Sequence, residues 1–348
     1  MYLEPVVGLG QQENFGCTRF ILERPNTTAA MTAEEYFNKG VSKTEQGKYT
    51  EAVSDFDKSI EIRSDLATYI ARGIAKEHLN KFDEAITDFD FVIQNSSQTL
   101  AIAYYNRANT KLSQQDITGA IVDFTKTIEI DPDDAMAYFN RGNAQRMINN
   151  FTGALSDYTR TIEISPEYDK AYNNRGNVKH KLENYAGAIE DYTQAIQLSQ
   201  FEPLYYFNRG NSNGKLKDFY GALKDYDFAI ELNPQNADFY YNRGTIRGIL
   251  NNFKDSIIDF DKSILLNPIG SDAYFYRGVA KCRLNEFKDG ITDFGNAIKI
   301  NENYAFAYYN RGLAKIELNQ KDTACLDFHK AAELGMTLAH DLIKRYCK

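Results

Sequence analysis

Two groups of side chains could do chemistry: those that form catalytic or metal-binding motifs, and the asparagines. The first group lacks the spacing that such motifs need. The sequence holds no glycine-rich phosphate loop, no His-Glu-x-x-His and no Gly-x-Ser-x-Gly motif. No pair among its four histidines stands at metal-ligand spacing with a carboxylate partner; they are His78, His180, His329 and His340. The sequence therefore predicts a chain without catalytic activity, cofactor or bound metal.

Asparagine forms the second group, because it recurs at a regular interval. One series consists of Asn38, Asn106, Asn140, Asn174, Asn208, Asn242 and Asn310, and a second follows three residues later at Asn109, Asn143, Asn177 and Asn211. An amide side chain both donates and accepts, so a row of asparagines can hydrogen-bond an extended peptide backbone whatever its side chains. Asparagine is also a mediocre helix former, so a neutral helix surface should not favour it so regularly.

We therefore predict that a ligand contacts the amides of Asn106, Asn109, Asn140, Asn143, Asn174, Asn177, Asn208, Asn211 and Asn242. The alternative is that asparagine merely suits an exposed polar helix face. Basic side chains gather in the same part of the chain, at Arg146, Lys170, His180, Lys181 and Lys215. In a chain of net charge −8 this gathering favours an acidic or carboxylate-bearing ligand. Random placement of 40 basic residues could also produce it.

These residues belong to an internal repeat. Arg-Gly, or a close variant, recurs with its small second residue at Gly40, Gly73, Ala108, Gly142, Gly176, Gly210, Gly244, Gly278 and Gly312, in steps of 33, 35 and then 34 residues. We number each unit so that this small residue is position 8. Nine units then run from about Ala33 to Leu334, the fourth opening at Ala135, and the two asparagine series occupy positions 6 and 9.

Small and aromatic residues recur within each unit at helical spacing. Position 4 is always Tyr, position 24 is always Phe or Tyr, and position 20 is always small. Positions 4, 7, 8 and 11 share one helix face, and positions 17, 20, 21, 24, 27 and 28 share another. Turn-forming Asn and Asp lie between the two stretches, and Pro closes some units. Each unit is predicted to be two antiparallel helices that approach at the small positions 8 and 20.

The pattern Tyr-x-x-x-Gly, a small position 20, an aromatic position 24 and a closing Pro, at a 34-residue period, resembles the tetratricopeptide (TPR) repeat over about 302 of the 348 residues. It departs from the usual pattern with Tyr where Trp is common and Arg where Leu is usual. The resemblance implies an all-α fold, a right-handed α-solenoid superhelix of antiparallel helix pairs whose first helices line a concave groove. Family members are usually scaffolds or peptide receptors.

The resemblance also implies that positions 2, 5, 6, 9, 12 and 13 face the groove, so both asparagine series would lie there. This double ladder resembles the asparagine ladder in the TPR part of O-GlcNAc transferase, which holds a peptide backbone; the catalytic part of that enzyme has no counterpart here. Position 5 is mostly aromatic and could add apolar contacts. Neither position 5 nor position 6 is ever basic, so the clamp with which chaperone co-factors hold a Glu-Glu-Val-Asp tail is incomplete.

An acidic residue accompanies the basic residue at position 7 of every unit. Position 23 is always Asp: Asp55, Asp88, Asp123, Asp157, Asp191, Asp225, Asp259, Asp293 and Asp327. Folding a hairpin about positions 15 and 16 brings position 7 nearly opposite position 24. We predict a basic–Asp pair in every unit, with a structural role.

The ends differ from the repeats. We predict an irregular N-terminal segment over residues 1–31, nine units over 32–334 and a C-terminal capping helix within 335–348. Thr32-x-x-Glu35 is a capping box for the first helix. Gly335 should end the ninth unit, and residues 336–347 should form a helix that covers it with Leu338, Leu342, Ile343 and Tyr346.

Composition limits the partners and the compartment. The net charge of −8 argues against nucleic-acid binding, because phosphate backbones require a basic surface. Apolar runs are too short for a membrane helix and the start lacks a secretion signal, so no membrane contact and a cytoplasmic location are expected. Cys17, Cys282, Cys325 and Cys347 lie far apart, which suits a reducing compartment and predicts neither a disulfide framework nor a zinc cage.

The sequence thus predicts a non-catalytic scaffold, a monomer or weak homo-oligomer, that captures an extended and acidic peptide or protein segment in its concave groove. Two alternatives stay open. The chain could be a structural assembly subunit that uses its convex face or its ends, or it could be the regulatory subunit of an enzyme whose chemistry a partner supplies.

Overall fold

The computed structural model describes residues 31–96 and 100–347, and within these residues the regular structure is helical, without a strand. The first helices of the nine units are α1 (Ala33–Glu45), α3 (Leu66–His78), α5 (Leu100–Ser113), α7 (Ala135–Met147), α9 (Asp169–Lys181), α11 (Pro203–Lys215), α13 (Ala237–Ile249), α15 (Ser271–Arg283) and α17 (Ala305–Glu317). The second helices are α2 (Tyr49–Ile62), α4 (Phe82–Asn95), α6 (Ile117–Ile130), α8 (Phe151–Ile164), α10 (Tyr185–Leu198), α12 (Phe219–Leu232), α14 (Phe253–Leu266), α16 (Phe287–Ile300) and α18 (Lys321–Glu333). A final helix, α19 (Ala339–Tyr346), follows them.

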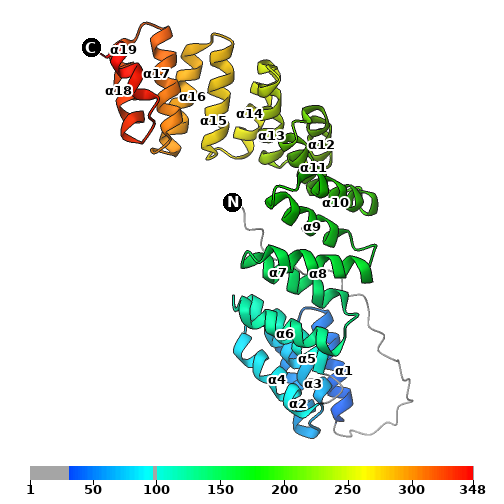
Figure 1. The fold of residues 1–348 in the computed structure, drawn as a ribbon. Helices are drawn as coiled ribbons and strands as arrows, with labels where there is room; N and C mark the ends of the chain where they lie inside the picture. The colour runs from blue at the N-terminus through cyan, green and yellow to red at the C-terminus, as the bar shows by residue number, and fades with distance from the viewer. Residues whose placement is uncertain (1–30, 97–99, 348) are drawn as a thin grey trace.

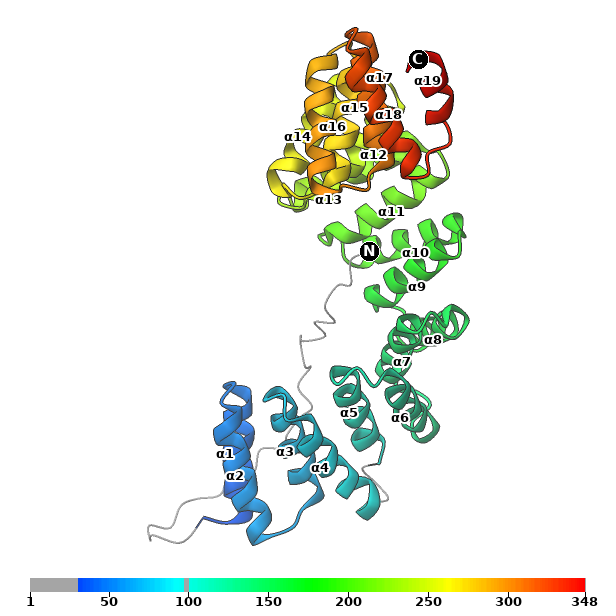
Figure 2. The ribbon, with the colours of Figure 1, turned by 90° about the vertical axis from the view of Figure 1, so that its left-hand side faces the viewer.

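The helix pairs form one elongated, curved stack from α1 and α2 at one end to α17, α18 and α19 at the other (Figure 1). A view turned by 90° shows the same end-to-end order (Figure 2). Each helix packs on the helix before and after it, and first helices of successive units also touch, as α9 touches α11 and α11 touches α13. Alternate helices approach each other on the inner side of a curved stack, so the first helices line that side. The predicted all-α solenoid of antiparallel helix pairs is confirmed.

Tight turns join the two helices of each unit through one left-handed residue at position 15. Gly47 has φ +72° in the first unit, and the other units use Asn80, Gln115, Asn149, Glu183, Lys217, Asn251, Asn285 and Asn319, with φ between +58° and +67°. Asn tolerates this conformation better than most residues because its short side chain hydrogen-bonds locally. The left-handed backbone at position 15 therefore explains why turn-forming residues such as Asn recur between the two helices of a unit.

Close approach of the two helices explains the small residues. A Cβ atom built on Gly176, at position 8 of the fifth unit, would lie only 2.8 Å from Cε1 of the Tyr192 ring at position 24. Position 24 is at most 2% exposed in every unit, and position 20 is fully buried as Ala188 in the same unit. The core is therefore a file of aromatic rings, each set against a residue that leaves it room.

The predicted pairing of positions 7 and 23 is found in all nine units. Arg175, for example, donates from Nε and Nη2 to the two carboxylate oxygens of Asp191, at 3.0 and 2.7 Å, and in the first unit Nζ of Lys39 lies 3.7 Å from Asp55. The nine aspartates are at most 3% exposed. The Arg175 guanidinium also lies 5.7 Å from the ring centroid of Tyr172 at position 4. Each arginine is therefore held between a carboxylate and an aromatic face.

The two ends carry different caps. At the start, the capping box of Thr32 and Glu35 is present, with each side chain bonded to the other's backbone N–H. Gly335 ends the ninth unit with φ +90°, as expected. Helix α19 is shorter than predicted, because a turn precedes Ala339. Leu342, Ile343 and Tyr346 are partly buried, but Leu338 is 60% exposed and does not face inward.

The cysteine prediction is wrong for one pair. Cys325 on α18 and Cys347 just after α19 form a disulfide, with Cα atoms 5.5 Å apart. They are 22 residues apart in the sequence, and the turn before α19 folds that helix back onto α18. Cys282 is free and half-buried, and burial followed by the charge of Asp293 raises the pKa of its thiol to about 11. Cys17 and the rest of the irregular segment predicted for residues 1–31 lie, except for Met31, outside the described residues.

Candidate ligand-binding groove

Five first helices carry the asparagines selected from the sequence. Position 6 supplies Asn106 on α5, Asn140 on α7, Asn174 on α9, Asn208 on α11 and Asn242 on α13. Position 9 supplies Asn109, Asn143, Asn177 and Asn211 on the first four of these helices. All nine side chains are partly exposed. Hydrogen bonds link asparagines of successive first helices, so together with their neighbours they form a strip along the middle of the solenoid.

Position 9 is anchored from below by tyrosine in three units. The hydroxyl of Tyr158 donates to Oδ1 of Asn143, that of Tyr192 to Oδ1 of Asn177, and that of Tyr226 to Oδ1 of Asn211, each at 2.8 Å. These tyrosines occupy position 24 of units four, five and six and are at most 2% exposed. Each buried hydroxyl therefore finds its acceptor in a groove asparagine of its own unit.

Position 6 joins successive units in the middle of the strip. Nδ2 of Asn140 donates to the Tyr105 hydroxyl at 2.9 Å and, at 3.5 Å, to Oδ1 of Asn109. Nδ2 of Asn174 donates to Oδ1 of Asn143 at 2.9 Å. Asn208 continues the series with a bond of 3.0 Å to Oδ1 of Asn173, a neighbouring asparagine at position 5.

The two outer members of the position 6 series behave differently. Asn106 donates to the backbone carbonyl of Ile102, and Asn242 donates to that of Asp238, both at 2.8 Å and both within their own helix. The connected part of the strip therefore runs from α5 to α11. The sequence pattern alone treated all these asparagines alike.

Sequence reasoning missed the three tyrosines that hold position 9. Their signal was present in the repeat, because position 24 is Phe in the other six units and Tyr only in units four, five and six, where position 9 is Asn. Unit three is the exception, with Asn109 above Phe124. A change from Phe to Tyr at a buried position adds a hydroxyl that must find a partner, which points to the opposite asparagine.

The structure divides the predicted basic cluster. Arg146, Lys181 and Lys215 are exposed and lie at or next to the C-terminal ends of α7, α9 and α11, along one edge of the strip. Lys170 is also exposed but lies near the N-terminal end of α9, at the opposite edge. A helix of this length extends roughly 20 Å, so Lys170 is separate from the other three.

His180 does not add to this charge. Its Nδ1 lies 2.7 Å from Oγ of Ser212, and its ring meets Tyr185 edge-on with centroids 5.1 Å apart. Burial, and then the charge of nearby Lys215, lowers the pKa of His180. The imidazole is therefore neutral at pH 7 and acts as a polar contact between α9 and α11.

Position 5 belongs largely to the core. Phe139 is 8% exposed and its ring centroid lies 5.8 Å from that of Tyr158, while Phe207 and Tyr226 are 5.9 Å apart. These rings support the strip from beneath. The rings of Phe139 and Phe207 therefore contribute to the core, and the apolar contacts to a ligand expected at position 5 stay a prediction.

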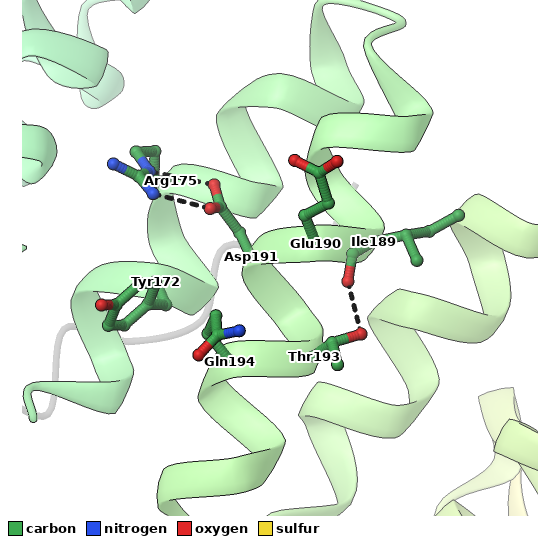
Figure 3. Close-up of a pocket in the computed structure, with 7 residues that line it drawn as sticks. All are labelled: Tyr172, Arg175, Ile189, Glu190, Asp191, Thr193 and Gln194. Carbon is green, nitrogen blue, oxygen red and sulfur yellow. Dashed lines mark hydrogen bonds and ion pairs between the residues drawn. The ribbon is translucent and has the colours of Figure 1, made fainter.

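Two open pockets lie away from the asparagines. The pocket in unit five has a volume of about 480 Å³ and is lined by Tyr172, Arg175, Ile189, Glu190, Asp191, Thr193 and Gln194 (Figure 3). Unit four repeats it with the same positions of its own helices. Figure 3 shows the Arg175 guanidinium bonded to Asp191, and its Nη1 donates to Thr159 at 3.2 Å. Because the Arg175 guanidinium and the Asp191 carboxylate in this space already bond each other, we place no candidate site there.

The described residues also lack two other kinds of site. No group of three or more His, Cys, Asp or Glu side chains among them is placed to hold a metal ion. In the same part of the chain, no helix is long and apolar enough to cross a membrane.

Comparisons with known proteins agree with the helix pairs. Models described as tetratricopeptide repeat match residues 33–66, 101–134, 124–156, 169–200, 203–236 and 237–269, which together cover just over half of the chain. No curated protein matches the sequence at a significant level.

Solved structures share the fold at low sequence identity. A tetratricopeptide repeat protein from Parabacteroides merdae is 19% identical, with a TM-score of 0.54 over 72% of this chain and 100% of that one. The hetero-tetramer of Cut9 and Hcn1 from the APC/C contains a chain that is 15% identical, with a TM-score of 0.52 over 91% of this chain and 76% of its own. The TPR protein YrrB is 23% identical over 54% of this chain and 97% of its own, with a TM-score of 0.48. With the family models and the repeated helix pairs in agreement, the chain belongs to the tetratricopeptide repeat family.

Proposed function

We propose that this protein is a non-catalytic scaffold that binds an extended segment of another protein, or a peptide, along the asparagine strip of its inner face. The linked amides from α5 to α11 carry the proposal. A groove that is already assembled costs little ordering on the scaffold side, so binding favours a ligand that supplies its own extended strand.

Charge supports an acidic segment. Arg146, Lys181 and Lys215 are exposed along one edge of the strip, and none of them forms an ion pair with a carboxylate within residues 31–96 and 100–347, whereas the position 7 arginines are paired with buried aspartates. Cations that have no carboxylate of their own chain beside them are available to carboxylates of a ligand. The proposed ligand is therefore an extended peptide with acidic side chains.

Replacing two linked amides tests this function. Asn140→Ala with Asn174→Ala removes the bonds to Tyr105 and Asn143. We expect this variant to bind a labelled 12-residue Glu-rich peptide about tenfold more weakly, measured by fluorescence anisotropy, with unchanged helix content by circular dichroism. Asn310→Ala at position 6 of unit nine is the matched control and should bind normally. Equal affinity of the double variant and the wild type would exclude the strip as the binding surface.

The outer face gives a specific reason to keep the assembly subunit as a second candidate. On α14 and the loop after it, Ile258, Leu265 and Ile269 are 62%, 72% and 78% exposed. Position 29, which Leu265 occupies, is Glu or Gln in seven of the other eight units. If this face joins subunits, Leu265→Glu will abolish an oligomer that light scattering detects for the wild type. A wild-type chain that stays monomeric at every concentration excludes self-assembly through α14.

A further inference from the structure

We propose that Tyr158, Tyr192 and Tyr226 are positioning residues that turn Asn143, Asn177 and Asn211 so that the groove of units four to six presents a row of N–H donors. The ligand that fits this row is an extended peptide that directs backbone carbonyl or side-chain carboxylate oxygens at position 9. This inference rests on the proposed function and adds which atoms of the ligand meet the strip.

The hydrogen bonds determine the direction of each amide. A carboxamide is planar, with Oδ1 and Nδ2 on opposite sides of Cγ, so binding Oδ1 to the buried ring directs Nδ2 away from it. Each tyrosine hydroxyl holds Oδ1 of its asparagine at 2.8 Å. In Asn143 the same Oδ1 also accepts from Asn174 at 2.9 Å. Within the described residues, Nδ2 of Asn177 and of Asn211 donates to no other group, so both donors are available to a ligand.

Burial keeps each tyrosine a donor. It raises the pKa of Tyr158 to about 12, and it moves the pKa values of Tyr192 and Tyr226 still further above the ordinary value for tyrosine. The three phenols therefore remain protonated at neutral pH, where each hydroxyl can donate to its asparagine.

The other units act as an internal comparison. Position 24 is Phe in units one, two, seven, eight and nine, where position 9 holds Val41, Ile74, Thr245, Val279 and Leu313. The same core site thus accepts a phenyl ring wherever no groove amide lies above it. Packing alone therefore does not require the hydroxyls of units four to six, and their shared feature is the asparagine that each one binds.

The exposed cations lie beside the same donors. Arg146, Lys181 and Lys215 are exposed at or next to the C-terminal ends of the helices that carry Asn143, Asn177 and Asn211. Cations and amide N–H groups both select oxygen acceptors. A peptide rich in Glu or Asp, with its carbonyls turned toward position 9, satisfies both sets of groups.

Removing the hydroxyls while keeping the asparagines tests the inference. The variant Tyr158→Phe, Tyr192→Phe, Tyr226→Phe should bind the labelled 12-residue Glu-rich peptide about tenfold more weakly, because the amides of Asn177 and Asn211 can then turn their oxygens toward the ligand, while Asn143 keeps only its bond from Asn174. Tyr220→Phe, which changes a residue that is 78% exposed, is the matched control and should bind as the wild type does.

A second variant tests the inference in the opposite direction, because it should bind the peptide more tightly. Unit three has Asn109 above Phe124, which is fully buried, so Phe124→Tyr should supply the missing hydroxyl and tighten binding about twofold to threefold.

A double-mutant cycle separates positioning from stability. Asn177→Ala should weaken binding in the wild type and have little effect once Tyr192→Phe is present, whereas a purely structural hydroxyl would lower the melting temperature and leave the affinity intact.

The outcomes distinguish this inference from the proposed function. Binding of the peptide by the wild type, full retention in the triple Phe variant and loss in the Asn140→Ala, Asn174→Ala variant would overturn the orienting role and leave the proposed function standing. No binding of the peptide by the wild type would overturn both. Equally tight binding of a Lys-rich peptide of the same length would overturn the preference for acceptor-rich ligands.

Discussion

Units four to six and the units that flank them share one backbone design but differ in how successive units are joined. In units two, three, seven and eight, Nη1 of the position 7 arginine bonds a carboxylate of the preceding unit: Arg72 to Asp57, Arg107 to Asp90, Arg243 to Asp227 and Arg277 to Asp261. In the middle the same atom bonds a threonine hydroxyl: Arg141 to Thr125, Arg175 to Thr159 and Arg209 to Thr193. The middle units are also those in which position 24 is Tyr and position 9 is Asn.

A second difference follows the first. Position 11 supplies a cation to the buried aspartate in seven units, but in units four and six it supplies an amide, Gln145 or Asn213. Units four and six thus have one cation fewer at the buried aspartate, whereas unit five keeps Lys179 there. A repeat protein can therefore keep one fold and still carry different polar groups in different units, because each unit contacts only its neighbours.

The largest expected effect is the loss of folding stability when a buried aspartate is removed, and it should differ between the two regions. Asp259→Ala in unit seven leaves Arg243 and Arg247 without the carboxylate that both now bind, and we expect a loss of about 3–5 kcal/mol in the free energy of unfolding. Asp225→Ala in unit six leaves only one cation, Arg209, without its carboxylate, so the loss in the free energy of unfolding should be smaller. Urea denaturation of both variants measures the difference. Equal losses would show that the second cation does not matter.

The next effect concerns the covalent bond at one flank. Reducing the bond between Cys325 and Cys347 should lower the stability of the last unit by about 3 kcal/mol, because the closed loop no longer restricts the unfolded chain. Hydrogen exchange should increase in α18 and α19 and stay constant in α1 and α2. Unchanged protection of α19 after reduction would mean that packing alone holds the cap.

A smaller effect on stability is expected when the partner of the position 7 arginine in the preceding unit is exchanged between Asp and Thr. Asp227→Thr gives a flanking joint the chemistry of the middle, and Thr159→Asp does the reverse beside Arg175. The Asp227 side chain is 57% exposed, so we expect a loss of no more than about 1 kcal/mol for the first change and a similar gain for the second. Both effects should shrink in high salt, as thermal melts can show. A salt-independent change would point to packing instead.

The smallest expected effect is the change of folding stability with pH that comes from position 12, which is Glu77 in unit two and His180 in unit five. Burial raises the pKa of Glu77 in unit two, so the folded chain holds this proton more tightly and loses stability as the pH rises above about 4.5. Burial lowers the pKa of His180 in unit five, so the folded chain loses stability as the pH falls below about 6.5.

Two substitutions separate these contributions. Glu77→Gln should raise the melting temperature by about 1–2 °C at pH 7, with the gain fading toward pH 4. His180→Gln should remove part of the decline below pH 6.5 and change little at pH 8. A gain for Glu77→Gln that persists at pH 4 would contradict a cause based on charge.

Much of the fold could be predicted from the sequence because its determinants are local and repeated. The 34-residue period, the small positions 8 and 20 and the turn residues each describe contacts within one hairpin, and nine copies of the pattern reinforce one another. The pairing of positions 7 and 23 was predictable for the same reason. The candidate site was predictable only as a row of residue types, since Asn106 and Asn174 occupy the same position and yet make different bonds.

The sequence was enough to predict the helix pairs, their number in the repeat and the pairing of positions 7 and 23, because these follow from periodicity and from steric fit at close range. Four features could be read from the three-dimensional structure alone: the direction of the amides in the strip, the basic residues that share an edge, the packing of His180, and the bond between Cys325 and Cys347. Those features depend on distances between units and on the return of α19 onto α18, and hydrogen bonds and disulfides form or fail over differences of about an ångström that no residue pattern specifies.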